Sequence, residues 1–109
     1  MALVEPSPSL GIVLVTAGSE AEADRLAHHL VEARLAACVN VFPVHSVYRW
    51  QDEVQSEPEW QLIIKTDLSQ FEALSQAIAE HHSYEVPEVI ALPIVAGLPA
   101  YLSWLQAQV

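Results

Sequence analysis

The sequence predicts a single α+β domain with the element order β-α-β-β-α-β and a further helix at its C-terminal end. Short segments rich in Val, Ile and Leu alternate with segments whose apolar residues recur at helical spacing. The 109 residues suit one domain, which we place at 10–109 after a loose lead-in at 1–9. No internal repeat or low-complexity tract interrupts this order.

The first half of the chain begins with a predicted strand at 10–16, LGIVLVT, which is largely apolar at both alternating sets of positions. Such a strand is expected to be covered on both faces. A helix follows at 19–36, because the letters SEAE fit a capping box and apolar residues then recur at helical spacing. The next strand is expected at 38–50. Its Pro43 cannot donate a ladder hydrogen bond, so this strand should be bulged or lie at a sheet edge.

The second half of the chain predicts a long hairpin, whose polar turn we place at 51–58 and whose returning strand we place at 59–66. Apolar residues at helical spacing predict a second amphipathic helix at 68–82. A fourth strand at 86–95 is interrupted by prolines. A short terminal helix at 98–109 completes the chain.

This element order is the ferredoxin-like split βαβ arrangement. Right-handed crossovers should place both central helices on one face of the sheet. The other face lacks that cover, although the strands at 10–16 and 59–66 carry apolar side chains on both sides. Large exposed apolar patches mark interfaces, so we expect a closed homo-oligomer. The alternative is that the long hairpin and the terminal helix fold over the second face.

The charge balance excludes several kinds of partner. Fourteen acidic residues oppose four basic ones, which gives a formal net charge of −10. Nucleic acids and anionic membranes need clustered Lys and Arg, so cations are the more natural partners. The single cysteine excludes an internal disulfide and fits a reducing compartment. No apolar run reaches the roughly 18 residues of a membrane span, and the lead-in lacks a signal-peptide pattern, so we expect a cytoplasmic protein.

The cysteine and the histidines are the candidate metal ligands. Cys38 is expected to be either a small buried residue or a contact for a soft metal. His28 and His29 are neighbours on a helix, so they cannot chelate one ion together and are expected to be exposed. His81 and His82 end the second helix, where protonated imidazoles complement the helix dipole. No H-x-x-x-H or C-x-x-C spacing predicts a preformed zinc site.

Several other residues are candidates for a binding site, and for some of them a structural role is the alternative. The stretch 84–88, YEVPE, could hold a cation or serve as acid and base, or it could be a solvated turn. Lys65 is the only lysine and lies in an apolar strand, where it needs a carboxylate or a ligand anion. Glu59 suits a solvated face, and Trp50 suits the core or a subunit contact. The chain has no P-loop, nucleophile elbow or Gly-rich dinucleotide turn, so we expect no enzymatic activity.

Five segments, taken together, resemble one known family. They are RLAACVNV at 34–41, SVYRW at 46–50, Glu59 with IIKT at 63–66, HSYEVPE at 82–88, and YLSWL at 101–105. In this order they resemble the CutA family of divalent-cation tolerance proteins, and the resemblance runs over nearly the whole chain. It implies a homotrimer of ferredoxin-like subunits, similar in build to the PII signalling proteins.

The resemblance also implies site residues. It makes Cys38 and His82 candidates for binding a metal ion. It implies a pocket between subunits, formed by Trp50, Glu59, Lys65, Tyr84 and Glu85. Two positions depart from the family pattern: Ser83 stands where a proline is usual, and Arg49 where an aromatic residue is common. We expect Ser83 to loosen the turn before the fourth strand, and Arg49 to alter which ligand fits.

These observations predict a non-enzymatic homotrimer that binds Cu(II) or another divalent ion weakly and needs no organic cofactor. The alternative is a PII-like sensor that binds a small carboxylate-bearing metabolite in clefts between subunits, with Lys65 as its cationic anchor. A fold analogy supports that alternative, and such analogies are weak guides to function. An enzyme using Glu85 and His82, or a structural trimer that anchors other proteins, is less favoured.

Overall fold

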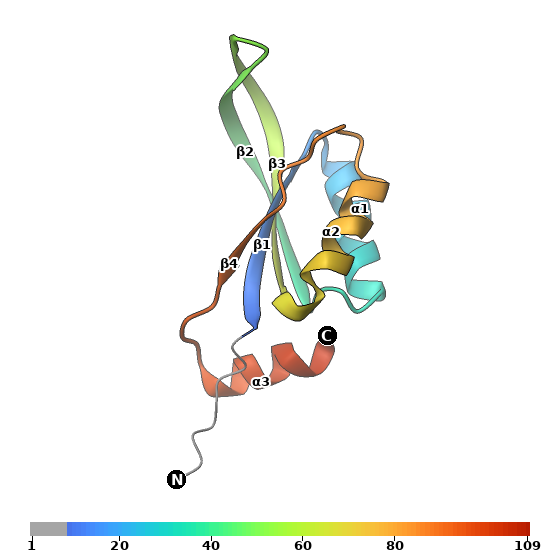
Figure 1. Ribbon diagram of the computed structural model, residues 1–109, viewed down its shortest axis with the longest axis vertical. Helices are drawn as coiled ribbons and strands as arrows, with labels where there is room; N and C mark the ends of the chain where they lie inside the picture. Colours follow the sequence, from blue (N-terminus) through green and yellow to red (C-terminus); the bar gives the residue numbers. More distant parts are fainter. Residues whose placement is uncertain (1–8) are drawn as a thin grey trace.

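The computed structural model describes residues 9–109 and contains one antiparallel sheet of four strands (Figure 1). The strands lie in the order β2-β3-β1-β4. Their bounds are β1 Leu10–Ala17, β2 Cys38–Trp50, β3 Glu53–Asp67 and β4 Ile90–Pro93. The predicted α+β fold is therefore confirmed. Of the predicted lead-in at 1–9, only Ser9 belongs to the described residues.

The helices occupy the positions that the split βαβ order requires. Their bounds are α1 Glu20–Glu32, α2 Phe71–His81 and α3 Pro99–Gln108, with a short 3-10 turn, η1, at Leu68–Gln70. Figure 1 shows α1 and α2 together on one face of the sheet. The amide of Glu22 donates to Oγ of Ser19 over 3.1 Å, which confirms the Ser19 half of the predicted capping box. The carboxylate of Glu22 accepts hydrogen bonds from Ser83 instead of completing the box.

The core lies between this pair of helices and the sheet. Val13 and Val15 of β1 alternate with residues that face the other way, and both are fully buried. Burial of each such aliphatic side chain contributes about 1.5–3 kcal/mol. The other fully or nearly fully buried aliphatic residues of this core are Leu26, Leu30, Leu62, Ile64, Leu74 and Ile78.

The hairpin is longer than the sequence predicted. Its turn is only Gln51 and Asp52, whose φ angles of 51° and 66° suit the tight turns of two-residue hairpins. The placement of the turn at 51–58 was therefore wrong. The polar residues there pair with β2 instead, as Ser46 does with Glu57. This part of the hairpin extends beyond the helices (Figure 1).

Two other element boundaries differ from the prediction, and the structure decides between the two roles considered for Pro43. Helix α1 ends at Glu32 rather than near residue 36, and Arg34 follows with a left-handed φ of 58°. Strand β4 is shorter than the predicted 86–95. Pro43 keeps its place in the register opposite Trp60, so β2 is an edge strand without a bulge at that position.

The second sheet face, opposite α1 and α2, is covered only in part. Helix α3 packs near Lys65 of β3, whose Nζ lies 5.7 Å from the centre of the Tyr101 ring. The alternative, in which the terminal helix folds onto this face, therefore holds at that end. The hairpin instead projects away from it (Figure 1). No helix within residues 9–109 has the length and apolar character needed to cross a membrane.

Candidate functional site

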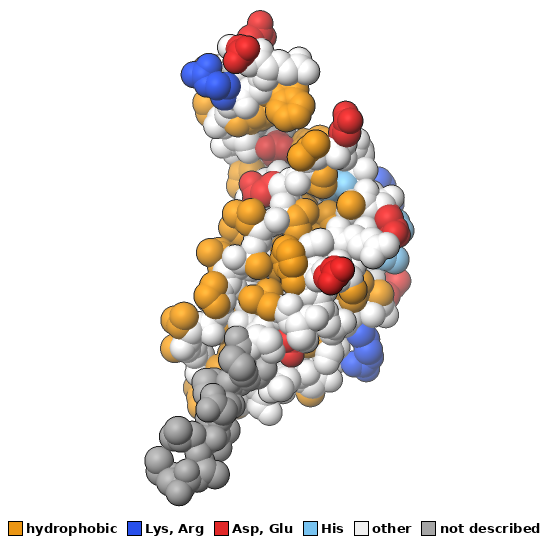
Figure 2. All heavy atoms as spheres, viewed as in Figure 1, with side chains coloured by type: hydrophobic (Ala, Val, Ile, Leu, Met, Phe, Trp, Pro, Cys, Tyr) orange, Lys and Arg blue, Asp and Glu red, His pale blue; other side chains and the backbone are white. Residues whose placement is uncertain are grey.

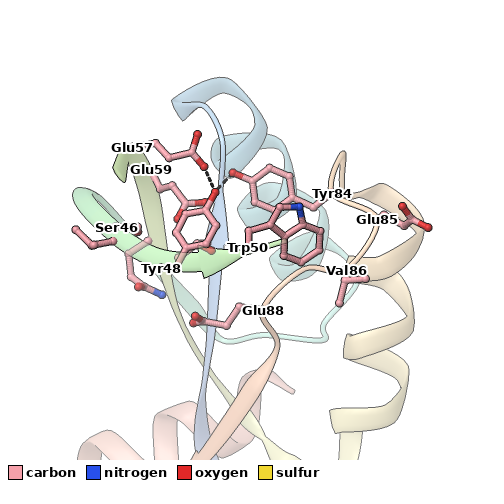
Figure 3. A pocket seen from close by; sticks show the side chains of 12 residues that line it. Ser46, Tyr48, Trp50, Glu57, Glu59, Tyr84, Glu85, Val86 and Glu88 are labelled. Carbon is pink, nitrogen blue, oxygen red and sulfur yellow. Dashed lines mark hydrogen bonds between the residues drawn. The ribbon is translucent and has the colours of Figure 1, made fainter. Parts of the chain in front are cut away.

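A cavity of about 640 Å³ lies where the hairpin leaves the sheet (Figure 3). Strand β1, both strands of the hairpin, and the loop between α2 and β4 all contribute to it. We call it the acidic cavity. It is lined by Thr16, Ser46, Val47, Tyr48, Trp50, Glu57, Glu59, Gln61, Tyr84, Glu85, Val86 and Glu88.

Strand alternation places the polar residues of β3 in this cavity. Leu62 and Ile64 point into the core beneath the helices, so Glu57, Glu59 and Gln61 project from the second sheet face. Thr16 lies directly opposite Gln61 in the register of β1 and β3. The cavity floor is therefore set by the same pairing that builds the core.

Two tyrosines hold two of the carboxylates. The hydroxyl of Tyr84 donates to Glu59 over 2.7 Å, and the hydroxyl of Tyr48 donates to Glu57. Burial and the hydrogen bond to Glu59 raise the pKa of Tyr84. The hydrogen bond to Glu57 raises the pKa of Tyr48 to about 12. Both phenols therefore stay protonated at neutral pH and keep their carboxylates in place (Figure 3).

All the charged side chains that line the acidic cavity are glutamates. Burial and the negative charge of Glu59 raise the pKa of Glu88, and a hydrogen bond with Gln61 offsets part of that effect. Among the described residues that line the cavity, none is Lys, Arg or His. A cation that enters would reduce this repulsion, whereas an anion would increase it.

His82 supports the loop from beneath and has no free nitrogen. Its Nε2 lies 2.7 Å from the carbonyl oxygen of Thr16, and its Nδ1 lies 3.0 Å from the amide nitrogen of Tyr84. A carbonyl only accepts and an amide only donates, so in the neutral ring the proton is on Nε2. Its side chain is fully buried, and Glu22 lies 3.6 Å from Nδ1.

The structure brings together four of the five residues predicted for a pocket. Trp50, Glu59, Tyr84 and Glu85 all line the acidic cavity. Lys65 does not. It lies six positions beyond Glu59 on β3, a separation of roughly 20 Å along the strand.

The two predicted metal ligands lie apart in the chain. Cys38 is half-buried and pairs with Lys65, whereas His82 bonds Thr16, which pairs with Gln61. Lys65 and Gln61 are separated by roughly 13 Å along β3. Within residues 9–109, no three His, Cys, Asp or Glu side chains converge closely enough to form a ready-made metal site. Cys38 and His82 therefore do not fit one shared Cu(II) ion within a single chain.

The sequence missed Tyr48 and Glu57 as site residues. Both lie in the part of the hairpin that includes the segment expected to be a turn. The signal was present in the alternation of Glu57, Glu59 and Gln61, which places all three on one side of a strand. This alternation predicts a shared face only if the strand is known to begin before Glu57.

The sequence is similar to known divalent-cation tolerance proteins. The family model described as CutA1 divalent ion tolerance protein matches residues 11–108. Over 100 residues the chain is 47% identical to the chloroplastic protein CutA of Arabidopsis thaliana, covering 91% of this chain and 54% of that one. Over 96 residues it is 47% identical to the divalent-cation tolerance protein CutA of Thermus thermophilus, covering 87% and 93%. The chain thus spans about half of the plant relative.

Solved structures of similar proteins have the same fold. The periplasmic divalent cation tolerance protein CutA from Archaeoglobus fulgidus aligns with a TM-score of 0.89 at 35% identity, covering 91% of this chain and 97% of that one. CutA1 from Oryza sativa aligns with a TM-score of 0.89 at 42% identity, covering 94% and 95%.

Proposed function

Because the chain belongs to the CutA1 family of divalent-ion tolerance proteins, we propose that it is a non-enzymatic homotrimer that binds divalent cations weakly, with Cu(II) as the first candidate. The observation that carries this proposal is the charge of the acidic cavity. Glu57, Glu59, Glu85 and Glu88 line it, and no cationic side chain of the described residues does. The net charge of −10 adds a long-range attraction for cations.

Weak binding follows from the arrangement of the carboxylates. A tight site needs several ligands that converge with the geometry the ion requires. Glu57 and Glu59 each accept a hydrogen bond from a tyrosine, so part of their capacity is already used. Cu(II) binds most strongly among the common divalent ions of its series, which makes it the first ion to test.

Calorimetric titration of the protein with Cu(II) tests the cavity directly. The variant with Glu57→Gln and Glu59→Gln keeps the shape of the cavity and removes two charges, so it should lose most of the heat. Glu72→Gln removes one charge from the exposed part of α2 and is the matched control. If the wild type releases no heat with Cu(II), the proposal fails. If the double variant titrates like the wild type, the cavity is not the site.

Cys38→Ala and His82→Ala belong in the same titration, because the family resemblance names both residues. His82 already uses both ring nitrogens, so metal binding there would break two hydrogen bonds. We expect Cys38→Ala to change the heat only if a second copy of the chain supplies further ligands. Unchanged heats in both variants would remove these residues from the site.

The homotrimer rests on the apolar surface that the single chain leaves exposed. Figure 2 shows hydrophobic side chains gathered along the sheet. Val54 on the hairpin is 66% exposed and Val95 after β4 is 90% exposed. Others that remain exposed are Val47, Trp50, Val86, Ile90, Leu92 and Leu98. Surfaces of this kind are characteristic of subunit interfaces.

A PII-like sensor is the second candidate, because a volume of about 640 Å³ lies within the range of small-molecule sites. The lining favours a cationic or amine-bearing molecule over the carboxylate-bearing one that the sequence suggested. A carboxylate would need a cation from another copy of the chain, since Lys65 of the same chain is roughly 20 Å away. Thermal-shift screening separates the two: stabilisation by amines supports the revised ligand, and stabilisation by organic acids alone contradicts it.

A further inference from the structure

His29 of α1 and His81 of α2 contact each other across the outer surface of the two helices. Their ring centres are 4.2 Å apart, and the ring planes are inclined by 35°. His81 is exposed and His29 is half-buried, so solvent reaches the pair. The sequence predicted solvent exposure for His29 and a helix-end role for His81. It could not show the pair, because 52 positions separate them along the chain.

The orientation of His81 leaves one nitrogen available. Its Nδ1 lies 2.8 Å from the carbonyl oxygen of Ala77, one turn back along α2. A carbonyl only accepts, so in the neutral ring the proton is on Nδ1 and the lone pair is on Nε2. Metal-binding imidazoles are commonly held in this way, with the second nitrogen donating to a carbonyl or a carboxylate.

His29 has nitrogens that nothing else in the described part of the chain uses. Within residues 9–109 its side chain makes no hydrogen bond or ion pair, and it contacts the ring of His81. The neighbouring His28 differs, because Asp24 lies 3.6 Å and Glu32 lies 4.0 Å from its ring nitrogens. Of these two adjacent histidines, only His29 is free to share a ligand with α2.

We propose that His29 and His81 form a two-imidazole site for a divalent transition-metal ion of the Zn(II) or Cu(II) type, with water completing the coordination. Two nitrogens bound to one tetrahedral zinc at 2.0–2.1 Å are about 3.3 Å apart. Ring centres 4.2 Å apart bring both side chains within reach of one ion, and binding requires the rings to turn from this contact until one nitrogen of each points at the metal. This site rests on the ring pair alone and goes beyond the cation binding proposed for the acidic cavity.

The affinity of such a site is modest. Two protein ligands leave the remaining positions to water, and no third acidic, cysteine or histidine side chain among residues 9–109 converges on the pair. Imidazole nitrogen suits zinc and copper, whereas magnesium prefers oxygen ligands. The site therefore selects transition metals, while the carboxylates of the acidic cavity also attract harder cations.

Titration with Zn(II) alone, followed by long-range proton–nitrogen NMR spectra of the histidine rings, tests the pair. The nitrogen signals of His29 and His81 should shift together and saturate at the same Zn(II) concentration. His29→Gln should weaken the response of His81 by about tenfold or more, and His81→Gln should do the same to His29. His28→Gln is the matched control on α1 and should leave both responses unchanged.

Several results would overturn the site. Zn(II) shifts at His81 that persist in His29→Gln would mean that His81 binds the ion without His29. A response confined to His28 would assign the metal to Asp24 and Glu32 instead. No shift in either ring would exclude binding. The variant with Glu57→Gln and Glu59→Gln separates this outcome from the proposed function, because it alters the acidic cavity and leaves the ring pair intact.

Discussion

The amide nitrogen and the hydroxyl of Ser83 both donate hydrogen bonds to the carboxylate of Glu22, at 2.6 and 2.9 Å. They tie the first turn of α1 to the loop that carries Tyr84 into the acidic cavity. The sequence led us to expect that Ser83, in place of the usual proline, would loosen this turn. The structure shows a tethered turn instead, because Ser83 supplies two donors and proline has no amide hydrogen.

Replacing Glu22 should destabilise the fold. Glu22 is only 5% exposed, and Glu22→Gln exchanges an acceptor-only carboxylate for an amide that leaves one of these donors poorly paired. We expect the free energy of unfolding to fall by about 1–3 kcal/mol. Urea unfolding measures the change. Glu20→Gln, at an exposed position on the same helix, is the control and should cost much less. Equal losses in the two variants would contradict the role given to the Ser83 hydrogen bonds.

The same carboxylate predicts a pH dependence of stability. Burial alone would raise the pKa of Glu22, but the hydrogen bonds from Ser83 and the nearby His82 outweigh it and hold the pKa below its ordinary value of 4.5. Because the pKa is lower in the folded state, Glu22 stabilises the fold fully above the unfolded value, and this contribution is lost as the pH falls through the folded pKa. Below pH 4.5 the wild type should therefore lose stability more steeply than Glu22→Gln. Parallel profiles from urea unfolding at several pH values would count against this.

Removing the hydroxyl of Tyr84 should weaken the cavity wall. Glu59 is only 7% exposed, and Tyr84→Phe takes away its hydrogen-bond donor. We expect a loss of about 1–3 kcal/mol in the free energy of unfolding, because a buried carboxylate is left short of a partner. Tyr101→Phe keeps the ring beside Lys65 and serves as the control. Thermal unfolding of both variants measures the difference, and a Tyr84→Phe protein as stable as the control would refute the prediction.

Gly11 has no room for a side chain. A Cβ at this position would lie 2.7 Å from the carbonyl oxygen of Leu92 on β4 and 2.6 Å from Cγ of Leu68. The contact with backbone cannot be relieved by a change of rotamer, so Gly11→Ala should cost about 1–3 kcal/mol. At Gly18 the nearest atom would be the Tyr84 hydroxyl at 3.2 Å, and Gly18→Ala should cost less. A reversed order in urea unfolding would show that β4 moves easily.

The sequence predicted the central elements well because their signal is local. The apolar period around Leu26 and Leu30 marks α1, and the apolar run of β1 marks a strand covered on both faces. The prediction for the end of the hairpin failed because the segment 51–58 is mostly polar. A polar strand in a projecting hairpin has the same composition as a loop. The sequence alone does not measure how far strand pairing continues beyond the core.

The candidate site was predictable only in part. Glu59 and Tyr84 were named from the family resemblance, but 25 positions separate them, and only the fold brings the hydroxyl to the carboxylate. The resemblance also grouped Lys65 with Glu59, but here the fold keeps the two residues apart. Their shared strand keeps them roughly 20 Å apart within one chain. Distances of this kind depend on register, which is set by pairing between strands.

The proposed association of three chains is tested most directly by the mass of the particle in dilute neutral buffer. Static light scattering should return about three times the 12.0 kDa of one chain. Val54→Asp places a charge on the exposed apolar part of the hairpin and should shift the mass toward that of the single chain. A wild-type mass of 12.0 kDa would contradict the account, because the apolar second face would then be stable in water without a partner.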